Sequence, residues 1–204
     1  MGSRLLALLA LQAPVAGDLV CVSGYSLVGR TRDPLVAWLE SLPEGVVVVL
    51  DPGDVFAELE PSLRSRVVAL TDVWTGNAEE SEDFGGAKGM GPAAEAVAAL
   101  LKPGAVAVVR DGEQGCAVHA DGVTSVVPGY PETPVDTNGA GDTHTGVLLA
   151  ERAKGATWPD ACRRANAAGA IKVTRKGPTS APTAPSPSSR SRPRAPSSPR
   201  PTTC

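Results

Sequence analysis

The segment between residues 135 and 143, Val-Asp-Thr-Asn-Gly-Ala-Gly-Asp-Thr, combines small residues with two carboxylates just before a stretch of helical periodicity. Gly139, Ala140 and Gly141 leave room for a ligand to approach the backbone, and the first N–H groups of a helix have no partner within it. Together with the helix dipole, such N–H groups form an anion site. We therefore predict that a phosphoryl group binds here, with Asp142 placed to accept a proton from an attacking hydroxyl.

The same segment also has a purely structural interpretation. Asp-Thr-Asn-Gly is ordinary turn chemistry, and an aspartate such as Asp142 at the start of a helix is an ordinary N-cap. Both interpretations stand on this segment alone, so the choice depends on the rest of the chain.

A second candidate lies upstream, where Asn77 and Glu80 follow the apolar run at residues 67–70. Mg²⁺ prefers oxygen ligands and is usually held through few carboxylates, water and substrate phosphates, which suits this pair. The structural alternative is a capping box, in which Asn77 is the N-cap and Glu80 the third helical residue.

Two further segments carry small residues beside polar ones. Residues 105–118 predict a β-hairpin, in which Arg110 follows the first strand and Gly112 and Gly115 punctuate the turn. Residues 164–178 predict a helix rich in alanine and glycine that contains Asn166 and packs tightly on a sheet. Taken alone, both patterns are mostly structural.

In their order along the chain, these four segments resemble the motifs of the ribokinase family, the PfkB-type carbohydrate kinases, over roughly residues 5–181. The resemblance implies an ATP-dependent phosphotransferase that acts on a hydroxyl of a sugar or nucleoside. Asp142 is then the catalytic base, and Gly139, Ala140 and Gly141 form the anion hole.

The resemblance also assigns the other residues. Asn77 and Glu80 organise Mg²⁺ and the nucleotide phosphates, with Glu80 acting through water or phosphate. Asp136 and Asn138 join the loop at residues 176–177 around a monovalent cation such as K⁺. The nucleotide is lined by the hairpin and the last helix, through Arg110, Gly112, Gly115 and Asn166.

Apolar strand-like runs alternate with helical patterns along the chain, which predicts an α/β fold with a largely parallel central sheet and helices on both faces. The ligand is expected beyond the carboxyl ends of the strands, where the motifs gather. The predicted strands are 18–24, 46–50, 67–71 and 105–109, with an antiparallel edge strand at 123–127. The predicted helices are 33–40, capped by Asp33 with Pro34 at its first position, 92–101, 142–154 and 158–174.

Composition narrows the class of protein. The 204 residues carry 42% apolar side chains and a net charge of −3, which argues against nucleic acid or a membrane surface as the main partner. Four scattered cysteines and two histidines give no zinc or disulfide framework and fit a cytoplasmic protein. His144 is interpreted as a packing residue near the nucleotide, with a catalytic base as the alternative.

Both ends depart from the family pattern. Residues 5–16 resemble a short signal peptide but are too short to span a bilayer, and we expect a helix that packs on the sheet. Family members carry a longer N-terminal part that grips the sugar, together with a small β-lid, and neither is visible here. The alternative function is therefore a non-catalytic fragment that keeps part of the nucleotide-binding surface. An exposed sheet edge then favours poor solubility or a homo-oligomer.

The C-terminal tail differs in composition from the rest of the chain. Residues 1–182 are predicted to form a partial kinase domain, whereas the Pro/Ser/Arg-rich residues 183–204 have little to bury and are predicted to be disordered. Our hypothesis for the abrupt change is an out-of-frame translation, and the alternative is a tail that binds nucleic acid or an acidic surface.

Overall fold

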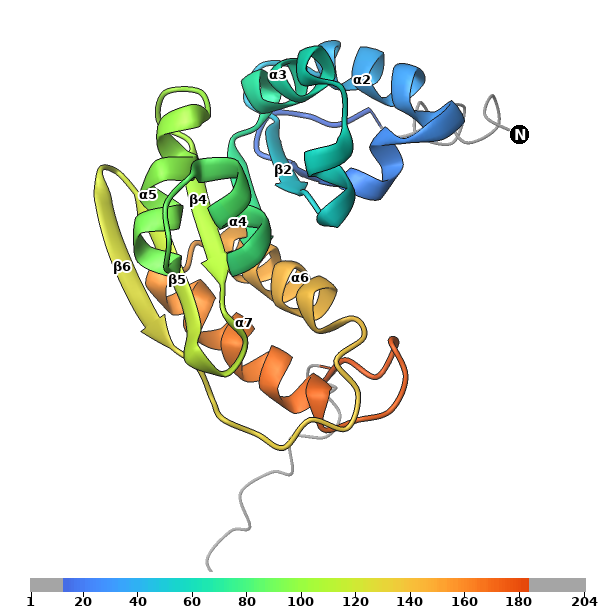
Figure 1. The fold of residues 1–204 in the computed structure, drawn as a ribbon. Helices are drawn as coiled ribbons and strands as arrows, with labels where there is room; N and C mark the ends of the chain where they lie inside the picture. The colour runs from blue at the N-terminus through green and yellow to red at the C-terminus, as the bar shows by residue number, and fades with distance from the viewer. Residues whose placement is uncertain (1–12, 184–204) are drawn as a thin grey trace, which may run out of the picture.

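Short runs rich in valine build a six-stranded sheet with the order β1-β2-β3-β4-β5-β6 (Figure 1). The computed structural model describes residues 13–183. The first four strands are parallel, and β5 and β6 are antiparallel to their neighbours, which confirms the predicted sheet and its antiparallel edge strand. The strands are β1 (Leu19–Ser23), β2 (Val47–Asp51), β3 (Val73–Asn77), β4 (Val106–Arg110), β5 (Gly115–Ala120) and β6 (Val123–Pro128).

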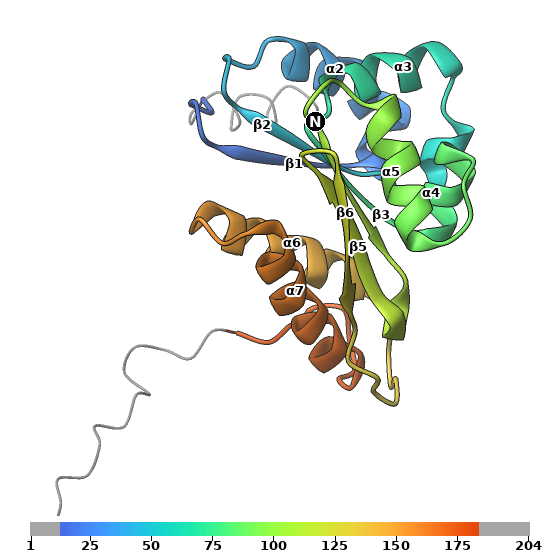
Figure 2. The same ribbon diagram turned by 90° about the vertical axis from the view of Figure 1, so that its left-hand side faces the viewer.

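Helices cover both faces of this sheet, as predicted (Figure 2). The β4–β5 hairpin turns through the short 3₁₀ helix η4 (Gly112–Gln114), and a similar element, η3 (Asp54–Glu58), follows β2. One face carries α2 (Arg32–Glu40), α3 (Pro61–Leu70), α4 (Ala78–Gly85) and α5 (Met90–Leu100), and the other carries α6 (Ala140–Ala153) and α7 (Trp158–Val173).

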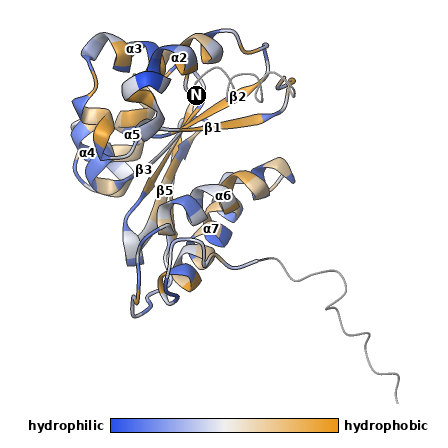
Figure 3. Ribbon diagram, turned by 90° about the vertical axis from the view of Figure 1, so that its right-hand side faces the viewer, coloured by the Kyte–Doolittle hydropathy of each residue, from blue (hydrophilic) through white to orange (hydrophobic). Residues whose placement is uncertain are grey.

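Alternate side chains of the central strands supply two separate cores. Leu50 and Trp74 pack under the first group of helices, whereas Val49 and Val108 pack with Leu148 of α6. Since both faces are covered, β2 is apolar almost throughout, as Figure 3 shows by its orange colour. The sheet is therefore a rigid platform whose strand ends position the polar residues.

The prediction of a strand at residues 67–71 is wrong. Residues up to Leu70 form the end of α3, which begins at Pro61, a favourable first helical residue. Leu63 and Val67, four residues apart, bury one side of this helix. A run of four apolar residues does not distinguish a strand from a buried helix, and β3 follows six residues later than predicted.

The start of α2 also differs from the prediction. The helix begins at Arg32 with Thr31 as its N-cap, and no side chain caps it. Asp33 lies in the first turn and accepts a hydrogen bond from Nε of Arg32 at 2.8 Å. Its carboxylate therefore binds the neighbouring arginine and does not cap the helix.

Some predictions fall outside the part of the chain that the structure describes. The expected N-terminal helix lies largely before residue 13, and the expected disordered tail lies almost entirely beyond residue 183. Between residues 13 and 183, none of the helices has the length and apolar character needed to cross a membrane.

Candidate active site

The first turn of α6 lies at the glycine-rich segment. Gly139 is the N-cap, with a left-handed φ of 77°, and a Cβ there would lie 2.6 Å from the carbonyl oxygen of Pro178. The N–H of Ala140 donates to Thr137 O and that of Thr143 to Gly139 O. Among residues 13–183, the N–H groups of Gly141 and Asp142 find no acceptor. Two donors at a helix start are thus available to an anion.

The alternative interpretation, in which Asp142 is the N-cap of this helix, is wrong. Gly139 is the N-cap, and no side chain among residues 13–183 caps α6. Asp142 lies in the first turn, near Cys21 of β1. Although Cys21 is an exposed residue, burial around its sulfur raises the pKa of the thiol to about 11, and the negative charges of Asp51 and Asp142 add to the shift. Asp51 and Asp142 therefore both lie within electrostatic range of Cys21.

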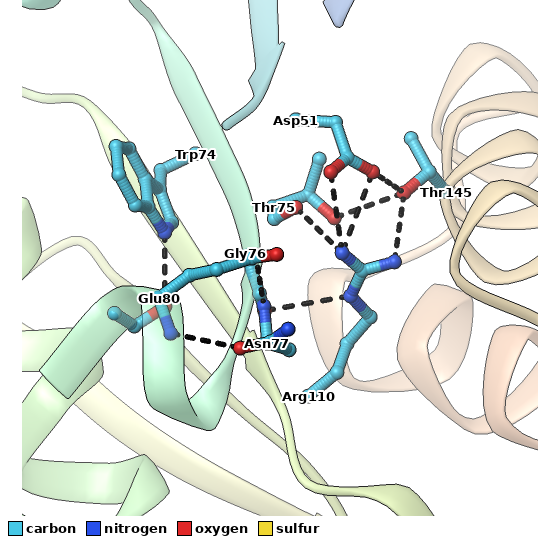
Figure 4. Close-up of polar contacts among 9 residues, drawn as sticks. Asp51, Trp74, Thr75, Gly76, Asn77, Glu80, Arg110 and Thr145 are labelled. Atoms are coloured by element: carbon cyan, nitrogen blue, oxygen red, sulfur yellow. Dashed lines mark hydrogen bonds and ion pairs between the residues drawn. The ribbon is translucent and has the colours of Figure 1, made fainter. Parts of the chain in front are cut away.

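Arg110 lies at the end of β4 and joins three elements (Figure 4). Its Nη2 contacts both carboxylate oxygens of Asp51 at 3.4 Å and donates to the Thr75 carbonyl at 3.0 Å. Its Nη1 lies 3.5 Å from Oγ1 of Thr145, and that hydroxyl donates to Asp51 at 3.1 Å. We call Asp51, Thr75, Arg110 and Thr145 the Arg110 cluster.

Only Arg110 of this cluster was predicted from the sequence. Asp51 is separated from Arg110 by 59 positions and from Thr145 by 94, so no local pattern connects them. A usable signal was present for Asp51, since it is a charged residue at the carboxyl end of a buried strand, where ligands of parallel sheets bind.

Asn77 and Glu80 form the capping box, which confirms the structural alternative for this pair. The N–H of Asn77 donates to Oε2 of Glu80, and the N–H of Glu80 donates to Oδ1 of Asn77, both at 2.8 Å. Burial raises the pKa of Glu80, while the Asn77 hydrogen bond and the charge of Arg110 act in the opposite direction. Glu80 and Arg110 are therefore near enough to interact electrostatically.

The donor set around Glu80 fits Mg²⁺ held mainly by water and phosphate. Between residues 13 and 183, no group of three or more His, Cys, Asp or Glu side chains is arranged to hold a metal ion by itself. A single carboxylate, with one oxygen engaged in the cap, matches a metal that depends on substrate phosphates for its other ligands.

A cavity of about 290 Å³ borders Asn77 and Glu80 on the side of α4. Asp54 of η3 and Asp83 of α4 also line it, so its rim is acidic. The glycine turn of α6 does not line this cavity. The capping box thus borders the cavity, and Figure 4 shows Asn77 beside Arg110.

The two glycines of the hairpin differ in what they contact. A Cβ on Gly115 would lie 2.2 Å from Val127 O of β6, so this glycine is required for packing. A Cβ on Gly112 would meet nothing within 4 Å, although its φ of 51° favours glycine. Gly112 is therefore the hairpin glycine with open space beside it.

Asn166 of α7 is buried against α6 and the end of β6. Its Nδ2 donates to the carbonyls of Val127 and Pro128 at 3.1 Å, and its Oδ1 lies 3.0 Å from Nε2 of His144. His144 is also buried. The pair ties both helices to the end of β6, which agrees with the interpretation of His144 as a packing residue.

The predicted cation loop is drawn together by hydrogen bonds. Asp136 accepts from the N–H of Gly177 at 2.8 Å and from that of Asn138 at 3.0 Å, and these contacts, Gly177 first, hold the pKa of its carboxyl below the usual value. Its carbonyl accepts from the buried ammonium of Lys172 at 2.8 Å. Three oxygens of Asp136 are thus each engaged by one protein donor, and one of these donors, the ammonium of Lys172, is itself a cation beside the residues predicted to hold the monovalent ion.

Comparisons with known proteins identify a curated relative over most of this chain. The chain is 31% identical over 172 residues to an uncharacterized sugar kinase, YegV, of Escherichia coli (strain K12), an alignment that covers 82% of this chain and 52% of that protein. The chain therefore spans about half the length of this curated relative.

Solved structures with the same fold include two kinases with bound ligands. The fructokinase of Vibrio cholerae O395, bound to fructose, ADP and calcium ion, has a TM-score of 0.72 and 28% identity, covering 83% of this chain and 59% of that one. The aminoimidazole riboside kinase of Salmonella enterica, in complex with aminoimidazole riboside and an ATP analog, has a TM-score of 0.66 and 25% identity, covering 78% and 57%. A family model matches residues 9–185, and the chain belongs to the pfkB family of carbohydrate kinases, with their ribokinase-like fold.

Proposed function

We propose that this protein is an ATP-dependent phosphotransferase that acts on a hydroxyl of a sugar or nucleoside. The observation that carries the proposal is the first turn of α6, where the N–H groups of Gly141 and Asp142 have no acceptor among residues 13–183 and lie beside the Asp142 carboxylate. The family match and the sugar and riboside kinases among the similar structures support it.

The backbone of the turn binds and orients negative charge. The N–H groups of Gly141 and Asp142 donate to phosphoryl oxygens, and the positive end of the α6 dipole stabilises them further. Because these donors are fixed by the helix, they need no reorganisation as charge develops during transfer. ATP supplies the phosphoryl group, and Mg²⁺ neutralises charge on its phosphates.

Asp142 is the general base in this proposal. Its carboxylate removes the proton from the acceptor hydroxyl, which increases the nucleophilicity of that oxygen as it approaches the phosphoryl group. Its position in the first turn of α6 keeps it within one residue of the anion-binding N–H of Gly141. Base and anion hole therefore belong to one rigid element.

Glu80 and Asn77 would hold Mg²⁺ through water and phosphate. In this proposal the turn around Gly112, the end of β4 at Arg110 and the part of α7 that carries Asn166 lie near the nucleotide. The negative charges of Asp51 and Asp54 act on Glu80, and this acidic environment favours a bound cation beside it. No step of the proposed reaction depends on K⁺.

Formation of ADP from MgATP, measured over a panel of pentoses, hexoses and nucleosides, tests the proposal. We expect turnover that requires both Mg²⁺ and one class of acceptor. Binding of MgATP without turnover on any acceptor contradicts the proposal and favours the alternative, a non-catalytic protein that retains a nucleotide-binding surface.

A further inference from the structure

We propose that Arg110 is a positioning residue, which fixes the first turn of α6 against the strand ends and does not itself bind the substrates. The inference rests on the proposed function, in which that turn is the anion hole. It assigns a supporting role to three further residues, whose contacts hold Arg110 in place: the side chains of Asp51 and Thr145 and the backbone carbonyl of Thr75 (Figure 4).

The guanidinium is surrounded by protein acceptors from three elements. Its Nε faces the Gly76 carbonyl of β3 at 3.4 Å, and its Nη2 contacts the Thr75 carbonyl and the Asp51 carboxylate. Its Nη1 faces Thr145 of α6. With each of its nitrogens directed at a protein oxygen and only 12% of the side chain exposed, Arg110 has little freedom to reach a ligand.

Thr145 connects this charge pair to α6. Its hydroxyl donates to Asp51 at 3.1 Å and lies 3.1 Å from the hydroxyl of Thr75. Thr145 is three residues after Asp142, so it lies almost one helical turn along α6. The Arg110 cluster thus fixes how α6, which carries the proposed base, is rotated about its axis and where it lies along that axis.

Gly141 brings the guanidinium close to the anion hole itself. A Cβ on Gly141 would lie 2.6 Å from Nη1 of Arg110, a distance at which one of the two groups must move. Because residue 141 lacks a side chain, a positive charge sits directly against the turn whose N–H groups face the anion. Such a fixed charge stabilises negative charge without direct contact.

The fork of an arginine suits this role better than the single charge of a lysine. A guanidinium presents five N–H donors in a fixed plane, whereas an ammonium is a compact point charge on a flexible stem. Arg110→Lys therefore keeps the charge but loses the simultaneous contacts with β2, β3 and α6. This variant separates positioning from charge alone.

Amide hydrogen exchange and steady-state kinetics of Arg110→Lys test the assignment. We expect faster exchange in the first turns of α6 in the free protein, and a kcat that falls at least about tenfold while KM for MgATP changes less than about threefold. Arg66→Lys, at an exposed ion pair with Glu40, is the matched control and should change neither. Unchanged α6 exchange, or a KM for MgATP that rises about tenfold at constant kcat, overturns the proposal.

A double-mutant cycle between Arg110→Lys and Gly141→Ala provides a measurement that needs no catalysis. The Cβ of the alanine displaces the guanidinium in the native protein but has less to displace in Arg110→Lys, so the two effects on the unfolding equilibrium constant should depart from additivity by more than about threefold. Additive effects overturn the proposal. If the wild-type protein shows no turnover, the proposed function fails, while the cycle and the exchange measurement still decide the role of Arg110.

Discussion

Gly177 donates its backbone N–H to Oδ2 of Asp136 at 2.8 Å and thereby joins two loops that lie 41 positions apart in the sequence. One loop leads into the glycine turn of α6, and the other follows α7. The ammonium of Lys172 reinforces the junction through the Asp136 carbonyl. The geometry of the anion hole therefore depends on contacts made by the last helix.

This junction should make stability depend on pH. The N–H groups of Gly177 and Asn138 hold the pKa of Asp136 below its ordinary value, so its stabilising contribution is fully present above the unfolded pKa of about 3.9 and is lost as the pH falls through the folded value. In Asp136→Asn this loss should be absent. Thermal unfolding of both proteins between about pH 7 and about pH 3 measures it.

Asp121→Asn, in the turn between β5 and β6, is the control for the loss of one carboxylate. Its melting temperature should follow that of the wild type across the range. If Asp136→Asn and the wild type lose stability in parallel as the pH falls, the Gly177 contact does not stabilise the ionised form.

Lys172 should make the protein independent of K⁺. Its buried ammonium already supplies a cation beside Asp136, so replacing K⁺ with tetramethylammonium at constant ionic strength should leave melting temperature and turnover unchanged. Lys172→Met removes that cation and should lower stability, with partial recovery on adding K⁺. A wild-type protein that requires K⁺ contradicts this expectation.

Asn166→Ala should destabilise the fold by about 2–4 kcal/mol, because it leaves the carbonyl of buried Val127, the carbonyl of Pro128 and the buried His144 without their shared partner. Urea unfolding measures the change. Asn138→Ala, at an exposed position, is the control and should cost far less. A change below about 0.5 kcal/mol for Asn166→Ala shows that the tie between α7 and β6 is unimportant.

Glu80→Gln should separate the helix cap from the binding of metal. Glutamine can still accept the Asn77 N–H, so stability should stay within about 0.5 kcal/mol, whereas the Mg²⁺ concentration for half-maximal activity should rise about tenfold. Because burial raises the pKa of Glu80, the Mg²⁺ requirement of the wild type should also rise with acidification before an ordinary glutamate protonates.

The matched control is Glu79→Gln, since Glu79 also lies in the first turn of α4. It should change the Mg²⁺ requirement less than about twofold. Equal effects of the two substitutions indicate that general negative charge, and not Glu80 itself, determines the response to Mg²⁺.

Local patterns were sufficient to predict most of the fold. Valine runs at β2 and β4 are continuous because both faces are buried, and the glycine before α6 marks its start. The pattern failed at β3, whose sequence Val-Trp-Thr-Gly-Asn contains turn-forming residues. Trp74 of this strand is buried against Phe56 and Phe84, which lie in other elements and stabilise it there. The residue pattern within the strand does not reveal these contacts.

The candidate site was predictable where its residues share one segment. Gly139 to Asp142 lie in one turn, and Asn77 and Glu80 lie in one capping box. The partners of Arg110 come from β2, β3 and α6, and only the packing of the sheet brings them together. Long-range pairing of this kind leaves no periodic signal.

The most direct test of the central claim compares Asp142→Asn with Asp160→Asn. Both aspartates lie in the first turn of a helix, so the two substitutions change a similar local charge. With the best acceptor and saturating MgATP, Asp142→Asn should lower kcat by about 10²- to 10⁴-fold, as expected for loss of a general base, while Asp160→Asn stays within about twofold of the wild type. Full activity in Asp142→Asn contradicts the assignment of Asp142 as the base that activates the acceptor hydroxyl.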